Sequence, residues 1–527
     1  MKKVLFIFLL SIVWLLVPSC SDSFLELYPE TNQVANEFYQ TKDQFDQALN
    51  SAYRGLRNIA YYGMFMDEQR SDNAFFDRYM GDRGPYNCRE KLALFIDDAV
   101  SANGTTHAAI RERWIQDWAN VARINAILDR VDNATEMVEA DKLAVKAEAS
   151  FLRAYYYFDL VKNWGGMPLN IHEIHAPNEA FIPRSSVEET YNQILSDLDT
   201  AISIGLPIPS NFPVDNGGRV TMGAAKMLRA EVNMTKPNPD YSIAEKDLKD
   251  ITNMHYDLLS NYADCFDPSK KNMEETIFEV QYTEDGSSDQ YSVFAYKMAP
   301  KCSNLEEMMG VGGTNYAGES GGWVVPTQKM IDSYEDGDLR LPASIAIVEG
   351  HSDGDLFYFE KLIHQPKGYV CPEGKDSRMM VIKYYHPPYA YSVRTKENFP
   401  IYRYAGALLL LSECLVQEGK SAEALPYINK VRARAGLDDL VTCSLEDVSN
   451  EQKHELAFEN HRWSDLKRQG MAKEVMTEYG KYIKESYPWV KATNNDGCFK
   501  IEDFRMIYAI PTRDIELFPD LTQNPGY

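Results

Sequence analysis

Hydrophobic residues recur every three or four positions between Glu139 and Trp164, and this spacing predicts an amphipathic helix. The apolar face of this helix consists of Leu143, Ala147, Phe151, Ala154, Phe158 and Val161. The opposite face carries four basic residues, Lys142, Lys146, Arg153 and Lys162. We therefore expect the helix to be buried on one side and solvated on the other, as in a layered helical body. The glycines at 165 and 166 and the proline at 168 end it, because glycine permits left-handed backbone and proline cannot donate a hydrogen bond.

The same periodicity predicts further helices, several of which open on a capping box, a reciprocal pair of bonds between side chains and backbone at a helix start. The boxes begin at Thr41, Ser186, Ser242 and Ser444. The expected helices cover about residues 42–60, 110–128, 140–164, 186–205, 221–233, 242–254, 402–418, 421–435 and 444–470. Eight of them form couples at about 42–131, 140–205, 221–254 and 402–435. This arrangement predicts a mainly α fold of tetratricopeptide-like helix pairs, although no clean ~34-residue period is present.

The helical pattern is interrupted between residue 276 and about residue 400. Glycine and aromatic residues are frequent there, and short strand-like runs occur at 277–282, 343–348, 356–363 and 379–385. We expect this segment to form an irregular insertion of loops and short strands between the third and fourth helix couples.

Charge excludes one large class of partners. The chain has 527 residues and a formal net charge of −24, and loss of Lys2 and Lys3 with a leader peptide would make it more acidic still. Such a chain repels phosphate backbones, so we expect no nucleic-acid partner. Aromatic residues make up 12% of the chain and include 33 tyrosines, which suits a wet binding surface as well as packing between helices.

The N-terminus predicts an exported, lipid-anchored protein. Two lysines precede an apolar run from Val4 to Val17, which is shorter than the ~20 residues of a membrane-spanning helix. The run ends at Val17-Pro-Ser-Cys20, which is similar to a lipoprotein processing site. We therefore expect a signal peptide at residues 1–19 and a lipid on Cys20, so that the only membrane attachment is this anchor.

Several motifs of catalysis or metal binding are present only in part. Gly318-Glu-Ser-Gly-Gly322 matches a nucleophile elbow in letters, but no buried strand precedes Ser320 and no helix follows it. His454-Glu455 begins like a zinc-protease motif, but Phe458 stands where the second histidine is needed. The seven cysteines other than Cys20 include no C-x-x-C pair. We expect no catalytic residue, no metal and no cofactor, and we interpret Arg462 and Asp465 as a structural ion pair on one helix face.

Two loops interleave aromatic and polar residues, Tyr61–Tyr86 and Tyr282–Trp323. Sugars present C–H faces that stack on flat rings, and hydroxyl groups that bond to carboxylates, amides and guanidinium groups. The candidate ligand-binding residues are Asp72, Asn73, Arg78, Tyr79 and Arg83 in the first loop and Tyr291, Tyr296, Asn315, Tyr316 and Trp323 in the second. For any single one of them, packing in the interior is the more common role.

Four stretches resemble one protein family. They are Glu148-Ala-Ser-Phe-Leu-Arg-Ala-Tyr-Tyr-Tyr-Phe-Asp-Leu-Val161 with Trp164-Gly-Gly-Met-Pro168, Tyr402–Glu413 with Ile428–Leu437, Glu455–Arg468, and Thr522-Gln-Asn-Pro-Gly-Tyr527. Together they are similar to the SusD/RagB family, surface lipoproteins that act with TonB-dependent transporters. Asn460 and Ser464 depart from the glycine and the aromatic residue that the family pattern leads us to expect.

The resemblance spans nearly the whole chain and implies one SusD-like domain over residues 20–527, in which the helix couples curve into a superhelical scaffold. It implies an outward-facing lipoprotein of the outer membrane in a Bacteroidetes-type cell, without enzymatic activity. The implied ligand is an oligosaccharide or polysaccharide held by loops in the two regions above. The implied partner is a SusC-like TonB-dependent outer-membrane transporter that receives the captured glycan.

Three alternatives stay open on the sequence. The first is a receptor for peptides or protein fragments of RagB type, since an acidic surface suits basic peptides. The second is a surface hydrolase that uses Ser320. The third is a structural adaptor built of helical repeats that binds no small ligand.

Overall fold

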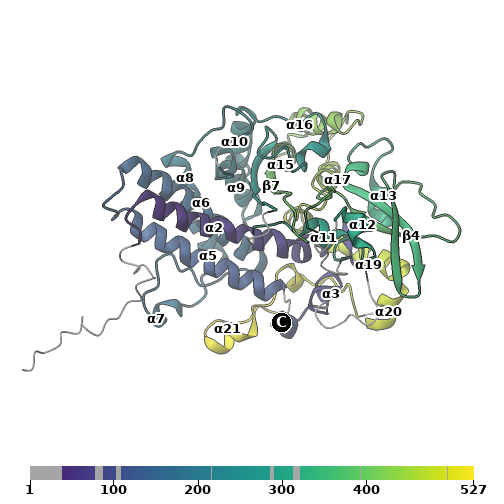
Figure 1. Cartoon of the computed structure of the whole chain (residues 1–527). Helices are drawn as coiled ribbons and strands as arrows, with labels where there is room; N and C mark the ends of the chain where they lie inside the picture. The colour runs from purple at the N-terminus through teal and green to yellow at the C-terminus, as the bar shows by residue number, and fades with distance from the viewer. Residues whose placement is uncertain are drawn as a thin grey trace, which may run out of the picture.

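The computed structural model describes residues 38–77, 87–102, 109–214, 217–284, 290–311, 321–391, 393–494 and 497–527. The protein is about 51% helical with a few short strands, which confirms the predicted mainly α class (Figure 1). The long helices of the N-terminal half are α2 (Lys42–Gly63), α5 (Ala109–Val131), α6 (Glu139–Trp164), α8 (Val187–Ile204), α9 (Met222–Thr235) and α10 (Tyr241–Thr252). The helices of the C-terminal part are α15 (Tyr404–Gln417), α16 (Ser421–Arg434), α17 (Leu445–Glu455), α18 (Arg462–Arg468), α19 (Ala472–Ser486), α20 (Pro488–Asn494) and α21 (Thr512–Leu517).

Shorter helical segments connect these elements. They are η2 (Met64–Glu68), α3 (Asn87–Ala93), α4 (Ala99–Ala102), α7 (Pro177–Ala180), η3 (Tyr262–Cys265), α11 (Phe294–Met298), α12 (Leu305–Met309), α13 (Gln328–Ser333), α14 (Leu341–Ser344) and η5 (Asp503–Met506).

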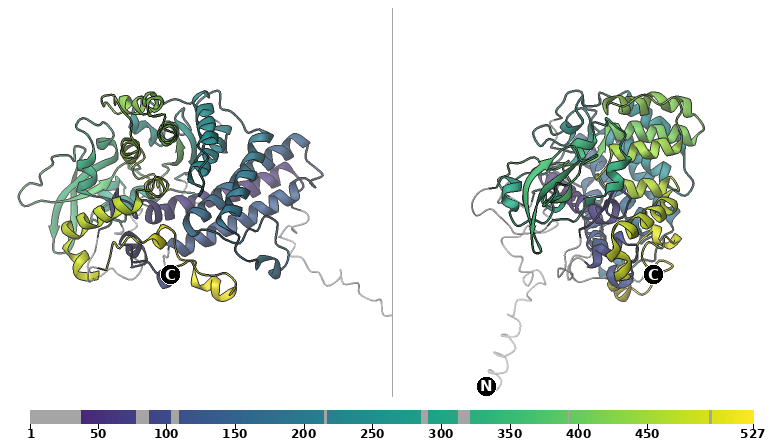
Figure 2. Two further views of the ribbon diagram at one scale, coloured as in Figure 1. Left: turned by 180° about the vertical axis from the view of Figure 1, so that it is seen from behind. Right: turned by 90° about the vertical axis from the view of Figure 1, so that its right-hand side faces the viewer.

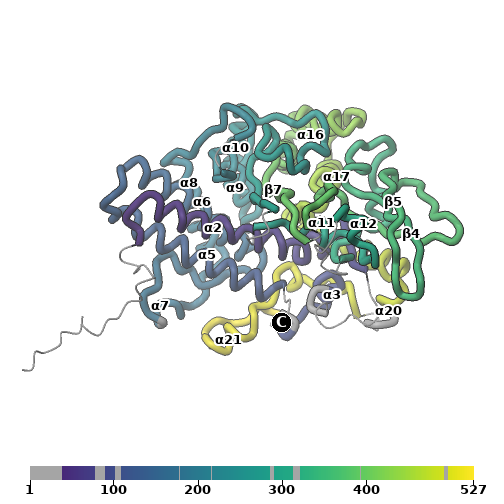
Figure 3. The backbone as a smooth tube through the Cα atoms, in the orientation of Figure 1, coloured from purple at the N-terminus to yellow at the C-terminus, as the bar shows by residue number. Residues whose placement is uncertain are grey.

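The helices pack in the predicted couples. Helix α2 packs against α5, α6 against α8, α9 against α10, and α15 against α16. Contacts of α5 with α6, of α8 with α9 and of α10 with α15 join these couples into a continuous helical layer, in which α2, α5, α6 and α8 lie side by side (Figure 1). The C-terminal segment returns to this layer, since Tyr508 N–H donates to Asn163 O at 2.7 Å and the Trp164 indole donates to Ala509 O at 3.2 Å. Figure 3 shows this last part of the chain, in yellow, running below α5.

Helix α6 is the central buried helix, and its apolar face behaves largely as expected. Phe151 and Ala154 are fully buried, and Phe158 and Val161 nearly so. Two positions differ from the prediction. Leu143 is 40% exposed, because burial of the helix starts only at Val145. Arg153, expected in solvent, lies in the interior because Asp197 accepts two hydrogen bonds from its guanidinium, at 2.7 and 2.8 Å.

The strands form three small antiparallel sheets. The first pairs β1 (Ala74–Phe75) with β3 (Val325–Pro326), and the second pairs β2 (Thr276–Val280) with β7 (Phe399–Arg403). The third has the order β5-β4-β6, from β4 (Ile345–Asp353), β5 (Leu356–Ile363) and β6 (Asp376–Val381). All four predicted strands are present, three of them with shifted ends, and the end of β7 overlaps the start of a predicted helix. The third sheet lies at one end of the molecule, away from α7 and α8 (Figures 1 and 2).

Three sequence predictions need correction. The helix expected at 444–470 is two helices, because Phe458 and Asn460 adopt left-handed φ values of 65° and 64° that interrupt helical bonding. Helix α10 begins one residue earlier than expected, because the Asp240 carboxylate rather than Ser242 caps it and accepts from Ile243 N–H at 3.1 Å. The third correction concerns the first predicted loop: its described part continues α2 and then forms the buried π-helix η2.

None of the helices in the described part of the chain is long and apolar enough to span a membrane. Within the same residues, Cys265, Cys371, Cys414 and Cys443 have free thiols.

Candidate functional site

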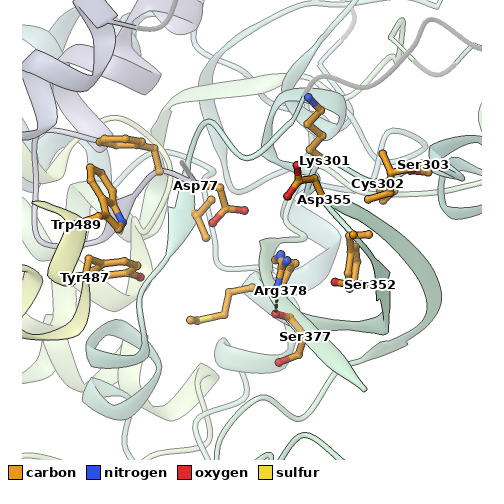
Figure 4. Close-up of a pocket in the computed structure, with 16 residues that line it drawn as sticks. Asp77, Lys301, Cys302, Ser303, Ser352, Asp355, Ser377, Arg378, Tyr487 and Trp489 are labelled. Carbon is orange, nitrogen blue, oxygen red and sulfur yellow. Dashed lines mark hydrogen bonds between the residues drawn. The ribbon is translucent and has the colours of Figure 1, made fainter. Parts of the chain in front are cut away.

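An open cavity of about 650 Å³ lies between the third sheet and helix α20 (Figure 4). Four stretches that are far apart in the sequence build it, at 76–77, 301–303, 352–379 and 487–489, and Val325 of β3 completes it. Aromatic rings gather on one side of this cavity and polar side chains on the other, as the close-up shows. Such a mixture suits a ligand that has both flat apolar faces and many hydroxyl groups.

The aromatic wall consists of Phe76, Tyr487 and Trp489. The rings of Phe76 and Trp489 meet edge to face at 5.7 Å, and Phe75 behind them stacks on Trp489 at 6.0 Å. The backbone under this wall is fixed by strand pairing, because Phe75 pairs with Val325 of β3. Tyr487 and Trp489 remain partly exposed while Phe75 is buried, so the wall has a rigid back and an accessible front.

The polar wall comes mainly from the third sheet. The hairpin between β4 and β5 turns through Gly354 and Asp355, and Gly354 takes a φ of 61°, as the first central residue of a type II′ turn requires. This turn places Ser352 and Asp355 at the cavity. The guanidinium of Arg378 lies 4.9 Å from the centre of the Phe357 ring and donates to the neighbouring Ser377 carbonyl at 3.0 Å.

The charged groups of the cavity are balanced. Asp77 and Asp355 are the acids that line it, and Lys301 and Arg378 are the bases. These groups supply both hydrogen-bond acceptors and donors within one hollow. The arrangement is therefore suited to a polyhydroxylated ligand without a strong charge of its own.

The structure places Asp72 and Asn73, two of the predicted ligand-binding residues, in the interior. Both oxygens of the Asp72 carboxylate are used, one by Arg462 at 2.7 Å and the other by Lys453 at 2.8 Å. Burial alone would raise the pKa of Asp72, but these two cations hold it well below its usual range. Asn73 is fully buried and donates to the Glu68 carboxylate at 2.8 Å. In this conformation their buried polar groups support the fold, and we leave both residues out of the candidate site.

Tyr296 and Trp323, two predicted ligand-binding residues of the second loop, lie together but do not line the cavity. The Lys297 ammonium is 5.2 Å from the Tyr296 ring centre and 5.1 Å from that of Trp323, and both aromatic side chains are 6% exposed. Tyr291 is partly exposed and lies under the Arg394 guanidinium at 5.1 Å. Gly322 N–H donates to Ala299 O at 2.7 Å, which joins the segments that lead into the cavity at Lys301.

The remaining predicted residues lie outside the described part of the chain. They are Arg78, Tyr79, Arg83, Asn315 and Tyr316 of the two loops, the lipidation residue Cys20, and Ser320 of the hydrolase alternative.

Sequence reasoning missed most of the cavity. Phe76 and Asp77 fall within the first predicted loop, but Arg378 precedes the predicted strand at 379–385, and Tyr487 and Trp489 lie outside every predicted element. The run Tyr487-Pro488-Trp489 was the available signal, because two large aromatic residues around a proline are unusual in a polar segment. Within the described residues, no three side chains of His, Cys, Asp or Glu come together as metal ligands.

Comparison with known proteins gives matches over both ends of the chain. The model of the SusD family matches residues 368–527, and a model described as "Starch-binding associating with outer membrane" matches residues 23–214. SusD-like protein P25 of Formosa agariphila is 24% identical over 97% of this chain and 97% of its own length. Starch-binding protein SusD of Bacteroides thetaiotaomicron is 23% identical over 77% of each chain. The structure of surface glycan-binding protein A from Bacteroides fluxus superposes with a TM-score of 0.72 at 25% identity, over 92% of this chain and 100% of that one.

These matches place the chain among SusD-like proteins, in agreement with the helix couples and short sheets described above. The chain belongs to the SusD/RagB family.

Proposed function

We propose that this protein is a surface glycan-binding lipoprotein that captures oligosaccharides in the cavity between the third sheet and α20. One observation supports this proposal above all: an aromatic wall of Phe76, Tyr487 and Trp489 faces a polar wall that contains Asp355 and Arg378. Stacking on the rings supplies affinity, and the polar groups select the geometry of the hydroxyl groups. The printed names of the relatives, starch-binding protein SusD and surface glycan-binding protein A, support the same ligand class.

Calorimetry against a panel of neutral oligosaccharides tests the ligand. We expect one or more glycans to bind, and Trp489→Ala and Tyr487→Ala each to weaken that binding by about tenfold or more, since aromatic anchors carry much of the energy of such sites. Tyr427→Ala is the matched control, because Tyr427 is a partly exposed tyrosine on α16 that does not line the cavity. Binding of basic peptides with no response to any glycan would instead favour the receptor of RagB type.

We further propose that the protein has no catalytic role and passes its ligand to a SusC-like TonB-dependent transporter in the outer membrane. The family assignment and the words "associating with outer membrane" in the matching model support this part. Extraction in mild detergent should recover the chain together with such a barrel protein. A glycan incubated with the purified chain should be recovered at its original length, and shortened products would contradict the absence of catalysis.

The anchor is proposed to be a lipid on Cys20, which places the protein on the outside of the outer membrane. Cys20→Ala should abolish incorporation of labelled fatty acid and release the chain from the membrane fraction, because the lipid supplies the only stable attachment. In intact cells the wild-type chain should be digested by an added protease. Protection from that protease with retained lipid would place the anchor on the inner side instead.

A further inference from the structure

A second hollow, on the side of α5 that carries Trp114 and Trp118, is an apolar groove of about 330 Å³. Helix α5 forms its floor, the segment around α7 forms one side, and α21 with the residues after it forms the other. We call it the α5–α21 groove and define it by Trp114, Trp118, Val121, Phe181, Leu517 and Phe518. The glycan cavity is at the other end of the molecule, where β4 and α20 lie (Figures 1 and 2).

This groove exposes large apolar side chains together. Leu517 is 64% exposed, Phe181 47% and Ile174 39%, and the Phe181 and Phe518 rings meet at 5.4 Å. Burial of apolar surface is favourable by about 25 cal/mol for each Å² removed from water. This cluster of exposed apolar side chains therefore favours an apolar occupant.

The described chain begins next to the groove. The ring of Tyr39 lies 5.3 Å from the Arg130 guanidinium at the end of α5. Arg130 in turn donates to the Glu173 carboxylate at 2.6 and 2.8 Å, and Glu173 precedes Ile174, which lines the groove. The segment that precedes residue 38 therefore joins the structure at the edge of the α5–α21 groove.

The preceding segment is long enough to reach the groove. Trp114 and Arg130 are separated by about 24 Å along α5, at ~1.5 Å for each residue of a helix. Residues 21–37 between the expected anchor and the described chain can span up to about 56 Å when extended, at ~3.3 Å for each residue. The segment also carries an apolar cluster, Phe24-Leu25-Glu26-Leu27-Tyr28, within an otherwise polar sequence.

We propose that residues 21–37 fold back onto the protein and place the apolar side chains of Phe24–Tyr28 in the α5–α21 groove. The docked segment buries its own apolar residues and the exposed rings of the groove in one step. If the chain is anchored at Cys20, as proposed above, docking shortens the tether and holds the groove end toward the membrane.

Photo-crosslinking in intact cells tests this with the complete, lipidated chain. The photoreactive residue p-benzoylphenylalanine replaces Phe24, and the crosslinked peptides are identified by mass spectrometry. We expect crosslinks within the same chain to peptides of α5 or α21. Leu517→Lys should lower their yield by about tenfold, because docking would then have to remove water from an ammonium group, which costs at least the ~1.4 kcal/mol of that factor.

Two matched controls sharpen the result. Val441→Lys alters an exposed apolar residue outside the groove, at 89% exposure, and should leave the yield unchanged. The photoreactive residue at Val34, outside the apolar cluster, should give few crosslinks to the groove. Crosslinks from position 24 to another protein, to a second copy or to a different part of the chain would each overturn the proposal, and so would the absence of any crosslink. Glycan affinity is measured on the same variants and should not change with Leu517→Lys, so failure of docking and failure of glycan binding are separate results.

Discussion

Asp117 is a carboxylic acid in the interior of the helical layer. It is fully buried on α5, and neither of its oxygens accepts a hydrogen bond from a described residue, although its side chain interacts with the Asp159 carboxylate. Burial raises the pKa of Asp117 well above its ordinary value, and the neighbouring charge of Asp159 raises it further, while Arg113 opposes both. Arg113 is already occupied, since it donates to Asp159 at 2.8 Å and to Asp67 at 2.6 Å. Burial and the Asp159 charge therefore favour the protonated form of Asp117 in the folded protein.

Replacing Asp117 by asparagine should stabilise the protein increasingly as pH rises. The folded chain holds a proton on Asp117 that the unfolded chain releases near pH ~4, so wild-type stability falls as pH rises from there to the raised folded pKa. The Asp117→Asn variant has no such proton to retain. Urea unfolding followed by tryptophan fluorescence at pH 4, 6 and 8 measures this. A constant difference between variant and wild type across that range would show that Asp117 is ionised in the folded protein.

Asp72 illustrates the opposite case, a buried carboxylate that is ionised and paired. Asp72→Asn leaves the buried cations of Arg462 and Lys453 without their partner, and we expect a loss of about 3–5 kcal/mol at pH 7. The pKa of Asp72 is lowered in the folded state, so this stability is present above pH ~4 and is lost as pH falls further. Glu478→Gln, in an exposed pair with Lys481, is the control and should change stability by less than ~0.5 kcal/mol. Equal effects of the two variants would contradict the role assigned to Asp72.

At the scale of the elements, the break between α17 and α18 is held by a residue far away in the sequence. The Glu68 carboxylate on η2 accepts from Phe458 N–H at 2.8 Å and from Asn460 N–H at 3.1 Å. Burial raises the pKa of Glu68 to about 7, although these hydrogen bonds oppose the shift. The φ of 64° at Asn460 explains why glycine is expected at this position, since both residues tolerate left-handed backbone.

Two substitutions at Asn460 separate backbone conformation from hydrogen bonding. Asn460→Gly removes the bond from Nδ2 to Ala60 O, at 2.8 Å, but suits the backbone, so we expect a change within about 1 kcal/mol. Asn460→Val loses the same bond and forces a β-branched residue into left-handed backbone, for a loss of about 2–3 kcal/mol. Urea midpoints at pH 7 give the comparison. If Asn460→Gly and Asn460→Val lower the stability equally, the left-handed backbone conformation does not determine which residue is tolerated at this position.

The periodicity of hydrophobic residues predicted the helices and strands that bury one face, and it predicted few other features of the fold. Helix α8 and strand β5 begin and end within a residue of their predicted bounds, because capping and alternation are local signals. The break at Phe458 depends on Glu68, which lies 390 residues away in sequence, so no local pattern could show it. The ion pair expected between Arg462 and Asp465 is wrong, because Arg462 pairs with Asp72, and Asp465 pairs with Arg468. The cavity was missed for the same reason, since Trp489 reaches Phe76 only through the folded chain.

Across the whole molecule, a network of buried charges joins segments that are distant in sequence. Its cations are Arg340, Lys383, Arg403, Arg432 and Arg434, and its buried acids are Glu275, Asp338, Glu451, Glu455 and Glu459, with the exposed Glu335 at its edge. These residues belong to or adjoin β2, β6, β7, α14, α16 and α17, so the network connects the helical layer to the sheet that forms the polar wall of the cavity. Figure 2 shows these green and yellow-green elements adjoining one another in both views.

Arg403 lies at the centre of this network, and its loss should weaken the whole molecule. Its guanidinium contacts Glu275 at 2.6 Å, Glu459 at 2.8 Å and Glu455 at 3.0 Å. Arg403→Met leaves these buried carboxylates with fewer partners, and we expect a loss of about 3–5 kcal/mol at pH 7 that added salt barely alters. Lys473→Met, in an exposed pair with Asp503, is the matched control and should have little effect.

The dependence of this loss on pH identifies its cause. Burial alone would raise the pKa of Glu459, but Arg403 and Lys383 hold it below the ordinary value, so the stability it contributes is lost as pH falls. In Arg403→Met the pKa of Glu459 is lowered less, and the difference from wild type should therefore be largest at pH 7 and shrink toward pH ~3. Chemical unfolding of both proteins at several pH values measures that difference. A loss that stays constant with pH would arise from packing of the arginine side chain rather than from its charge, and the network would then not be what couples the sheet to the helices.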